Sequence, residues 1–436
     1  MPGKQKKGVA MRIGIIIGRI GDVDGVALET EKWIKVLKEM GHELYLLSGR
    51  YRKSILGEEF ETFIPGLSFF SPECEWEQDR AFFLPPDDPE ELLEHLHRVS
   101  DGWAIRMFKW VMQNNIEVIL SENASSLPTH ISMGMAIKKL VEHTGIRIVC
   151  HDHDFYWERG NRYFTPFPEV EDIIKETFPL QIPHAKHAVI NTPSKKVLKE
   201  KYGMNGVIVV PNVMDFDQPY GEIDEYNQDL LNSIGIGKND IPLFQITRIV
   251  KRKGIETALE LVERMDNENI KLVITGSAKD DERKGYYKKL IRIIKRNKLD
   301  ERVIFANRRI LNQRGETPNS EKIYSLSDAY AHATACTYFS EFEGFGNAFL
   351  EAVLSKTPIF VNNYKPVYWP DIGSKGFKTV MIEDNILTDE AIAEVEKIIV
   401  DKKLQKEIVE HNYNLGKLLF SFDTLREKLD LLFETT

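Results

Sequence analysis

The stretch LFQITRIVKRKGIETALELV, residues 243–262, contains an apolar run, a cationic loop and an amphipathic segment in direct succession. The run Leu243–Thr247 has the composition of a buried strand. Ile255, Leu259 and Val262 then recur at helical spacing. A continuous apolar strand followed closely by an amphipathic helix is typical of a parallel sheet that helices cover on both faces. The stretch therefore predicts an α/β fold.

The same alternation recurs along most of the chain. A polar, acidic stretch from Asp215 to Asp240 divides it into two series, so we predict two Rossmann-like, doubly wound domains. Ligands of such sheets bind outside the carboxyl ends of the strands, which makes a central cleft between the domains the expected site. The predicted strands are 12–18, 43–48, 118–121, 147–150, 188–191 and 207–211 in the first series and 243–247, 271–275, 302–305, 329–333, 358–361 and 378–382 in the second.

These patterns predict four segments along the chain. Residues 1–10 are expected to be a disordered tail, 11–215 the N-terminal Rossmann-like domain and 216–412 the C-terminal one. Residues 413–436 are expected to form a helix that packs back on the N-terminal domain. The apolar face of that helix requires a partner, because it carries Leu425, Leu429, Leu432 and Phe433.

Composition excludes several classes of protein. Of the 436 residues, 42% are hydrophobic and 29% are charged, as in globular proteins, and no apolar run approaches the roughly 20 residues needed to cross a bilayer. The net charge of −9 disfavours general nucleic-acid binding. Three widely spaced cysteines without a CxxC pair argue against a disulfide framework and a zinc site. The apolar run near the N-terminus is too short for a secretory signal, so we expect a cytoplasmic protein without an integral membrane segment.

The cationic loop in the opening stretch is suited to anions. Arg248 follows the predicted strand, and Lys251, Arg252 and Lys253 precede Gly254 and the helix. Guanidinium and ammonium groups at the end of a strand form an anion site. Taken alone, the loop is also compatible with a solvated run of charges.

The segment Glu343–Glu351 reads EGFGNAFLE and carries a carboxylate at each end. Its glycines permit close approach of a ligand to the backbone, Asn347 lies where a helix cap is preferred, and Ala348–Leu354 is the predicted helix. The N-terminus of a helix suits a phosphate, and carboxylates accept hydrogen bonds from vicinal hydroxyls. These features fit a nucleotide sugar, although two solvated glutamates are the alternative interpretation.

In this order, the motifs resemble the retaining glycosyltransferases of the GT-B fold, family 4 (glycosyltransferase group 1). The family's two glutamates around a GFG turn match Glu343 and Glu351, and its arginine and lysine before a glycine match Arg248 and Lys253. VVPNVMDFD (209–217) resembles the family's Asn-Gly-Val-Asp turn with Val-Met in the middle, and KLVITGS (271–277) also matches. The resemblance extends from Met11 to about Ile399.

The resemblance implies transfer of a hexosyl group, with retention, from a nucleotide-diphosphate sugar of the UDP-glucose or GDP-mannose type. No metal or other cofactor is implied. Arg248 and Lys253 would stabilise the leaving diphosphate, Glu343 would hold sugar hydroxyls and Glu351 the ribose. Further donor contacts are expected from Phe345, Gly346 and Asn347. The acceptor is expected to be small and soluble, such as a sugar, a sugar phosphate or a glycerate derivative.

The loop after the first strand is expected to contact the donor phosphate. The family has a glycine pair here, whereas this chain keeps Gly25 and has Asp24 in the other place. Contact is therefore expected through Gly25 and Val26. The GxGxxG pattern is not matched, which disfavours a dehydrogenase.

The segment IRIVCHDHDFYWERGNRYF, residues 146–164, ends a predicted strand with two histidines and two aspartates. Strand periodicity would place His151 and His153 on one face and the aspartates on the other. No third dedicated ligand is evident, so we predict no metal. The DHD triplet also mimics the Asp-x-Asp of metal-dependent GT-A transferases, but the downstream motifs fit GT-B. Family 4 has a histidine here near the reacting sugar, for which His153 is favoured and His151 is second.

The aromatic and charged loop that follows is expected to bind the acceptor, although a loop that merely packs is the alternative. Residues expected to contact the acceptor are Tyr156, Trp157, Arg159, Tyr163, Glu122 and Asn123. Rival functions are a GT-B phosphorylase, a sugar-nucleotide epimerase, or a protein that binds nucleotide sugars without catalysis. Formation of a homo-oligomer is left open.

Overall fold

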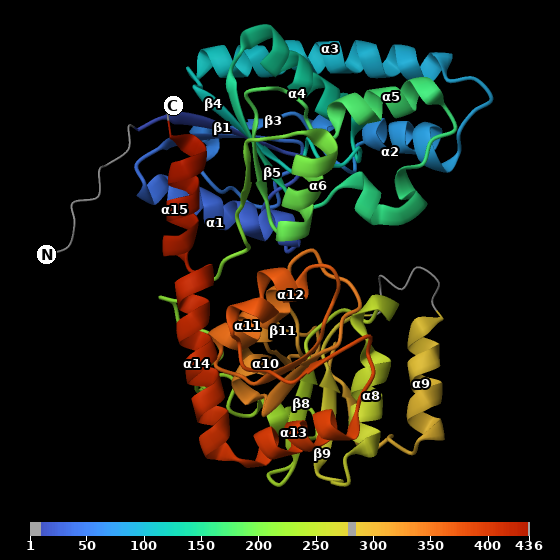
Figure 1. Ribbon diagram of the computed structural model, residues 1–436, viewed down its shortest axis with the longest axis vertical. Coiled ribbons are helices and arrows are strands. Elements are labelled where there is room, and N and C mark those ends of the chain that lie inside the picture. The colour runs from blue at the N-terminus through green and yellow to red at the C-terminus, as the bar shows by residue number, and fades with distance from the viewer. Residues whose placement is uncertain (1–9, 278–284, 435–436) are drawn as a thin grey trace, which may run out of the picture. The chain divides into compact units, whose positions relative to one another are not determined.

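A computed structural model describes residues 10–277 and 285–434. The predicted disordered tail therefore lies outside the described residues except for Ala10. The chain divides into two compact units, here called the N-terminal unit (residues 1–211 and 422–436) and the C-terminal unit (residues 212–421). Their colours run from blue to green and from green to red in Figure 1, the last helix of the chain belonging to the N-terminal unit.

The described part of the N-terminal unit contains one parallel sheet with strand order β3-β2-β1-β4-β5-β6-β7. The strands are β1 (Arg12–Ile17), β2 (Glu43–Ser48), β3 (Glu61–Phe63), β4 (Val118–Glu122), β5 (Arg147–Asp152), β6 (Lys186–Val189) and β7 (Val207–Val209). The α-helices are α1 (Gly25–Glu39), α2 (Pro72–Gln78), α3 (Glu90–Gln113), α4 (Ile131–Thr144), α5 (Pro168–Thr177), α6 (Thr192–Tyr202) and α15 (Phe422–Phe433).

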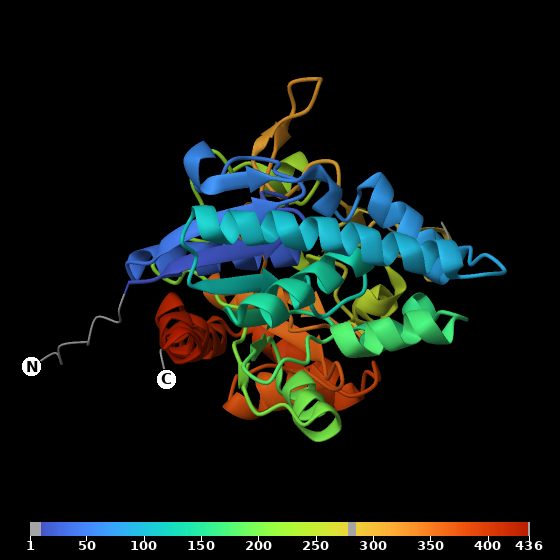
Figure 2. The same cartoon turned by 90° about the horizontal axis from the view of Figure 1, so that it is seen from above.

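Helices cover both faces of this sheet because its central strands are apolar on both sides. On one face, α3 and α4 bury residues such as Trp110 and Ile137 against Ile119 and Ile148 of the strands. Figure 2 shows α3, in cyan, running along the sheet. On the other face, Trp33 of α1 is fully buried. The predicted doubly wound sheet is confirmed for this unit.

The described part of the C-terminal unit contains a parallel sheet with order β10-β9-β8-β13-β14-β15 and a small hairpin. The strands are β8 (Ile241–Gln245), β9 (Ile270–Ile274), β10 (Val303–Phe305), β11 (Gly315–Glu316), β12 (Lys322–Ile323), β13 (Ala335–Tyr338), β14 (Ile359–Asn362) and β15 (Met381–Ile382). The α-helices are α7 (Leu230–Ser233), α8 (Ile255–Arg264), α9 (Tyr286–Arg296), α10 (Leu326–His332), α11 (Asn347–Leu354), α12 (Tyr368–Asp371), α13 (Asp389–Val400) and α14 (Lys402–Phe420).

The predicted apolar face of α8 lies in the core of this unit. Ile255, Leu259 and Val262 are fully buried in a cluster with Leu243 and Leu272 of the sheet. Burial of each such side chain contributes about 1.5–3 kcal/mol relative to leaving it in water. The opening strand-loop-helix stretch is therefore a structural unit of the sheet, as its sequence predicted.

One predicted strand, 329–333, is wrong. These residues belong to α10, and the strand β13 begins only at Ala335. The helix is favoured because Ser325 and Asp328 form a reciprocal cap: the Asp328 amide donates to Ser325 Oγ at 3.2 Å and the Ser325 amide donates to Asp328 Oδ2 at 2.7 Å. The strand was predicted from the short alanine-rich run alone, without regard to this cap.

The helix predicted over 413–436 is instead two helices with a break at Ser421, whose backbone is extended. α14 begins at Lys402, where the Asp401 carboxylate caps it, and belongs to the C-terminal unit. α15 packs on α1: its apolar face is buried, and Arg426 forms an ion pair with Glu39 at 2.8 Å. None of the helices in the described ranges combines the length and the apolar character needed to span a membrane.

Candidate active site

The strand order of the C-terminal unit reverses between β8 and β13, and the loops after these strands carry the two motifs singled out in the sequence. The cationic loop follows β8, and the GFG turn follows β13. Ligands of open α/β sheets bind at such a reversal, outside the carboxyl ends of the strands. The fold therefore brings Lys253 and Glu343, 90 residues apart in the sequence, into one site.

Lys253 and Glu343 form a buried ion pair at this position. The Lys253 ammonium donates to Glu343 Oε1, and each residue is 8% exposed. Arg252 Nη1 donates to Glu343 Oε2 at 3.0 Å and to the Phe342 carbonyl at 2.8 Å. Two cations therefore surround one carboxylate, which leaves an excess of positive charge beside the helix that follows.

Burial and charge act in opposite directions on this pair. Burial alone would raise the pKa of Glu343, but the cations of Lys253 and Arg252 outweigh it and hold the pKa below its usual value. Burial lowers the pKa of Lys253, while Glu343 opposes this change. Because the pKa of Glu343 is lowered, its contribution to stability is present above the ordinary glutamate pKa and is lost as the pH falls.

The GFG turn depends on glycine at position 346. Gly346 has a φ of 126°, and a Cβ there would lie 2.2 Å from Tyr364 Oη. The Tyr364 hydroxyl donates to the Phe345 carbonyl at 2.9 Å and so fixes the turn. The Phe345 side chain is buried against Phe420, so its backbone is the part near the turn.

Asn347, predicted as the helix cap, is instead the first residue of α11, and Gly346 is in the cap position. The Asn347 side chain is engaged elsewhere, since its Oδ1 accepts from Asn212 Nδ2 at 2.8 Å. Asn212 belongs to the Asn-Val-Met-Asp turn. The turn at the start of the C-terminal unit therefore contacts the beginning of α11.

Glu351 lies on the second turn of α11 and is half-buried. The Tyr330 hydroxyl donates to Glu351 Oε2 at 3.0 Å and also contacts the Ala348 carbonyl at 3.2 Å. Tyr330 is 2% exposed on α10. It therefore holds the Glu351 carboxylate in a fixed orientation.

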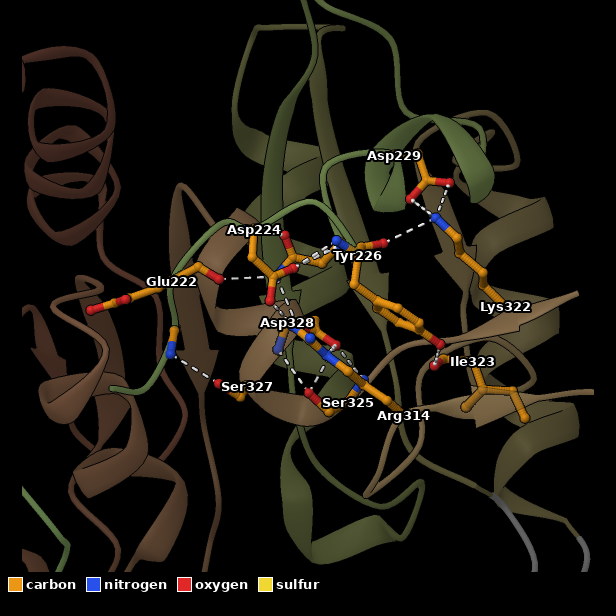
Figure 3. A network of polar contacts seen from close by, with 12 residues as sticks. Glu222, Asp224, Tyr226, Asp229, Arg314, Lys322, Ile323, Ser325, Ser327 and Asp328 are labelled. Carbon is orange, nitrogen blue, oxygen red and sulfur yellow. Dashed lines mark hydrogen bonds and ion pairs between the residues drawn. The ribbon is translucent and has the colours of Figure 1, made fainter. Parts of the chain in front are cut away.

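The helix that carries Tyr330 is anchored by the polar network in Figure 3, centred on Asp328. Asp328 is 1% exposed and accepts from Asn227 Nδ2 at 2.8 Å and from Arg314 Nε at 3.0 Å. The cation of Arg314 also pairs with Asp224 at 2.7 Å. The network joins the segment after the Asn212 turn to α10, and so supports the position of Tyr330.

Arg248 is exposed and lies in the loop after β8, which ends at Gln245, two residues before the predicted end of the strand. Gly276 explains the shape of this loop, because a Cβ there would lie 1.8 Å from the Thr247 carbonyl oxygen. The loops after β8 and β9 therefore approach each other closely just before Arg248.

In the N-terminal unit, the strand order reverses between β1 and β4. Gly25 and Val26 are the first two residues of α1, and Asp24 is its cap, accepting from the Ala27 amide at 3.2 Å. Asp24 also pairs with Arg19 at 3.2 Å. The residue that departs from the family pattern thus has a structural role, and the backbone at Gly25 and Val26 retains the open N-terminus of a helix.

Glu122, at the end of β4, is the third side chain that the metal interpretation of the histidines lacked. It pairs in register with His151 of β5, and His151 Nδ1 lies 2.9 Å from Glu122 Oε2. His153 Nε2 lies 4.0 Å from the same oxygen, and the two imidazole centroids are 4.2 Å apart. The predicted common face of His151 and His153 is therefore present.

Burial dominates the acid-base properties of this cluster. It raises the pKa of Glu122 to about 8 and lowers those of His151 and His153 to about 4 and about 3. Both histidines are therefore neutral at neutral pH, with nitrogen lone pairs available. Asn123, predicted to bind the acceptor, instead holds the loop: its Oδ1 accepts from the His153 amide at 3.0 Å.

The loop predicted to bind the acceptor is partly committed to packing. Trp157 stacks on Phe155 at 4.6 Å and on Tyr202 at 5.3 Å, so neighbouring rings occupy its stacking surfaces. Tyr156 contacts the Tyr202 hydroxyl at 3.2 Å. A loop that merely packs is the alternative left open above, and packing accounts for the positions of both Tyr156 and Trp157.

The remaining two loop residues differ in exposure. Tyr163 is buried, with its hydroxyl 3.0 Å from Thr129 Oγ1. Arg159 is exposed and pairs with Asp154 at 2.6 Å. Of the predicted acceptor residues in this loop, Arg159 therefore has the cation best placed to exchange its present partner for an acidic ligand.

Comparisons with known proteins agree with this geometry. A family described as "Glycosyl transferases group 1" matches residues 227–415. The chain is 30% identical to the mannosylglucosylglycerate synthase of Thermotoga maritima, covering 96% of this chain and 99% of that protein. It is 28% identical to the synthase of the same name from Petrotoga mobilis, covering 96% and 100%. This chain belongs to the glycosyltransferase group 1 family.

Solved structures show the same fold at low sequence identity. A glycosyltransferase from Rickettsia africae aligns with a TM-score of 0.66 and 14% identity over 98% of this chain and 100% of that one. The sucrose-phosphate synthase from Thermosynechococcus elongatus aligns with a TM-score of 0.63 and 13% identity over 97% and 98%. The predicted GT-B fold of this glycosyltransferase, with two Rossmann-like domains, is confirmed.

Sequence reasoning missed two contacts of this glycosyltransferase. The sequence pattern predicts a strand at Tyr330, and nothing local to this residue indicates Glu351 as its partner 21 residues later. The contact between Glu122 and His151 could have been inferred, because neighbouring parallel strands end at one edge of a sheet and bring their last residues together.

Proposed function

We propose that this glycosyltransferase transfers a mannosyl group, with retention, from nucleotide-diphosphate mannose to glucosylglycerate in the cytoplasm. The proposal is supported by the similarity over nearly the whole chain to two proteins named mannosylglucosylglycerate synthase. The observation that carries the transfer chemistry is the buried Lys253–Glu343 pair with Arg252 beside it, where the sheet order reverses. A glycerate derivative was among the acceptors expected from the sequence.

Breaking the bond between sugar and phosphate develops negative charge on the departing diphosphate. In the proposed mechanism, Lys253, Arg248 and the N-terminus of α11 stabilise this charge, and no metal is required for that step. The acceptor hydroxyl attacks the anomeric carbon from the face that the diphosphate leaves. The new glycosidic bond forms as the sugar-phosphate bond breaks, and the hydroxyl proton passes to the leaving phosphate oxygen.

The remaining roles follow from where the side chains lie. Glu343 would accept hydrogen bonds from sugar hydroxyls, because the cations around it keep it ionised. Glu351 would accept from the ribose, held by Tyr330. In the N-terminal unit, Gly25 and Val26 would contact the donor through their backbone amides. His153 would contact the reacting sugar. Arg159 would bind the carboxylate of the glycerate.

The function is tested by product analysis. Purified enzyme is incubated with GDP-mannose, UDP-glucose or UDP-N-acetylglucosamine, each with glucosylglycerate, glucosylglycerol or no acceptor. We expect mannosylglucosylglycerate from GDP-mannose and glucosylglycerate, with the α-anomeric configuration retained, and weaker transfer to glucosylglycerol because it lacks the carboxylate. Transfer from UDP-glucose or UDP-N-acetylglucosamine, but not from GDP-mannose, would refute the mannosyl assignment. An inverted anomeric centre would refute retention.

The same assay separates the rival functions. A phosphorylase would release a sugar phosphate when inorganic phosphate replaces the acceptor, and an epimerase would change the nucleotide sugar without an acceptor. A protein that only binds nucleotide sugars would give neither transfer nor slow hydrolysis of the donor. We expect slow donor hydrolysis without acceptor, since water can take the acceptor's place.

Replacing Tyr330 with phenylalanine is expected to raise KM for the donor about 3- to 10-fold while kcat changes less than about 2-fold. The change removes a hydrogen bond to a carboxylate that binds the ribose in both ground and transition states. Steady-state kinetics with varied donor measures it. The matched control is Tyr413→Phe, whose hydroxyl donates to the Phe216 carbonyl instead. Equal KM values in the two variants would contradict the positioning role.

A further inference from the structure

The buried cluster of Glu122, His151 and His153 in the N-terminal unit, here called the Glu-His-His cluster, has unused hydrogen-bonding capacity. Glu122 and His151 are 0% exposed and His153 is 6% exposed. Within the described part of the chain, Glu122 Oε1, His151 Nε2 and His153 Nε2 lack any hydrogen-bond partner. Leaving a polar atom buried without a partner costs about 1–3 kcal/mol, so these atoms point to an additional ligand.

Two other buried histidines of the same unit have a hydrogen-bonding partner at each ring nitrogen. His130 has Glu77 Oε2 at 3.0 Å from Nδ1 and the Gly66 carbonyl at 2.8 Å from Nε2. His187 has Asp152 Oδ2 at 2.7 Å and the Leu180 carbonyl at 3.1 Å. Both ring nitrogens of these histidines are used.

We infer that the Glu-His-His cluster binds one divalent transition-metal ion of the zinc or cobalt type. One ligand atom from each of the three residues lies within 4.8 Å of those of the other two. Coordination through His151 Nδ1 and Glu122 Oε2 would replace their present contact at 2.9 Å. The third ligand atom, His153 Nε2, lacks a hydrogen-bond partner and lies 4.0 Å from that oxygen. With metal-ligand bonds of about 2.1 Å, ligand atoms lie roughly 3–3.5 Å apart, so His153 Nε2 needs to approach Glu122 Oε2 by about 0.5–1 Å.

The surroundings hold the ligands in place. Trp33 stacks on the His151 ring at 3.9 Å, and the Thr30 hydroxyl donates to Glu122 Oε2 at 3.1 Å. Asn123 Oδ1 accepts from the His153 amide. Such contacts to the ligands fix their orientation and raise metal affinity.

The donor set selects the class of ion. Two imidazole nitrogens and one carboxylate oxygen suit Zn²⁺ and Co²⁺, whereas Mg²⁺ and Ca²⁺ prefer oxygen ligands alone. Burial raises the pKa of Glu122 to about 8, so Glu122 would release its proton when it binds the ion as a carboxylate. The Glu-His-His cluster belongs to the N-terminal unit, whereas the cationic loop belongs to the C-terminal unit. An ion on His153 Nε2 would leave Nδ1 of the same ring for the contact with the reacting sugar proposed above.

Metal content tests the inference without any glycosyl transfer assay, so its failure is distinguishable from failure of the proposed function. Untagged full-length enzyme is loaded with Zn²⁺ or Co²⁺, freed of loosely bound ions and analysed by elemental mass spectrometry, visible Co²⁺ absorption and thermal unfolding. We expect a single equivalent of metal per chain, a Co²⁺ spectrum typical of low coordination number, and a raised Tm. Mg²⁺ is expected to reproduce none of these effects.

Variants then assign the ligands. Glu122→Gln and His151→Gln are expected to weaken binding at least about 10-fold, whereas His187→Gln, which removes a buried imidazole whose nitrogens are both satisfied, is expected to retain it. Wild-type enzyme that retains no metal and shows no Tm shift would overturn the inference, whatever the stability of the variants. Binding that persists unchanged in both ligand variants would also overturn it.

Discussion

Replacing Lys253 with methionine is expected to lower kcat by about 10²- to 10³-fold, the effect typical of removing one group that stabilises charge in a transition state. Methionine keeps much of the side-chain volume but not the ammonium group. Lys253 is 8% exposed, so water cannot readily supply the missing stabilisation of the diphosphate. The measurement is kcat and KM with the proposed donor and acceptor.

The same substitution is also expected to destabilise the C-terminal unit, because it leaves Glu343 with one cation fewer. Breaking a buried ion pair from one side costs about 3–5 kcal/mol, and the value here should lie near the lower limit since Arg252 still pairs with Glu343. Loss of activity could therefore follow from unfolding alone. Urea unfolding of each variant measures the loss of stability, so that the activity can be compared at equal amounts of folded protein.

A double variant separates the two causes. In Lys253→Met with Glu343→Gln, the buried carboxylate that has lost one of its two cations is neutral, so we expect much of the lost stability to return. Activity should not return, because neither the ammonium nor the carboxylate is restored. The matched control is Lys251→Met, an exposed residue of the same loop, which should keep kcat within about 2-fold. A Lys253→Met enzyme with normal kcat would refute the leaving-group role.

Much of this site could be predicted because its residues follow strands. The apolar run before Arg248 and the run before the GFG turn each identify the carboxyl end of a strand, and parallel sheets gather such ends at one edge. Glycine and the two glutamates could then be assigned to a loop and helix that meet the cationic loop. The pairing of Lys253 with Glu343 is consistent with that reasoning, although the sequence alone gave no distance between them.

The errors have a common physical origin. The predicted strand at 329–333 was contradicted by a side-chain cap, and the cap position assigned to Asn347 was taken by Gly346, whose φ of 126° suits glycine. Both depend on a few local hydrogen bonds and dihedral angles rather than on apolar periodicity. Trp157 illustrates the same limit, since its aromatic character did not reveal that neighbouring rings stack on it.

Replacing Gly254 with alanine is expected to destabilise the C-terminal unit by about 2–4 kcal/mol. Gly254 has a φ of 60° at the start of α8, and a Cβ there would lie 2.0 Å from the Phe339 carbonyl oxygen. This neighbour is backbone next to the sheet, so relief requires the loops after β8 and β13 to separate. Since Lys253 and Glu343 lie on those loops, we expect kcat to fall at least about 10-fold. This loss is expected even at temperatures below the Tm of the variant, where the protein is folded.

Gly235→Ala is the matched control for this prediction. Gly235 also has a positive φ, 85°, but no atom lies within 4 Å of a Cβ built there. Its replacement should therefore cost only the conformational strain, about 1 kcal/mol, and leave kcat nearly unchanged. Urea unfolding and steady-state kinetics on both variants measure the difference. Equal losses of stability in the two variants would show that backbone conformation alone, and not the close approach of the two loops, requires glycine at position 254.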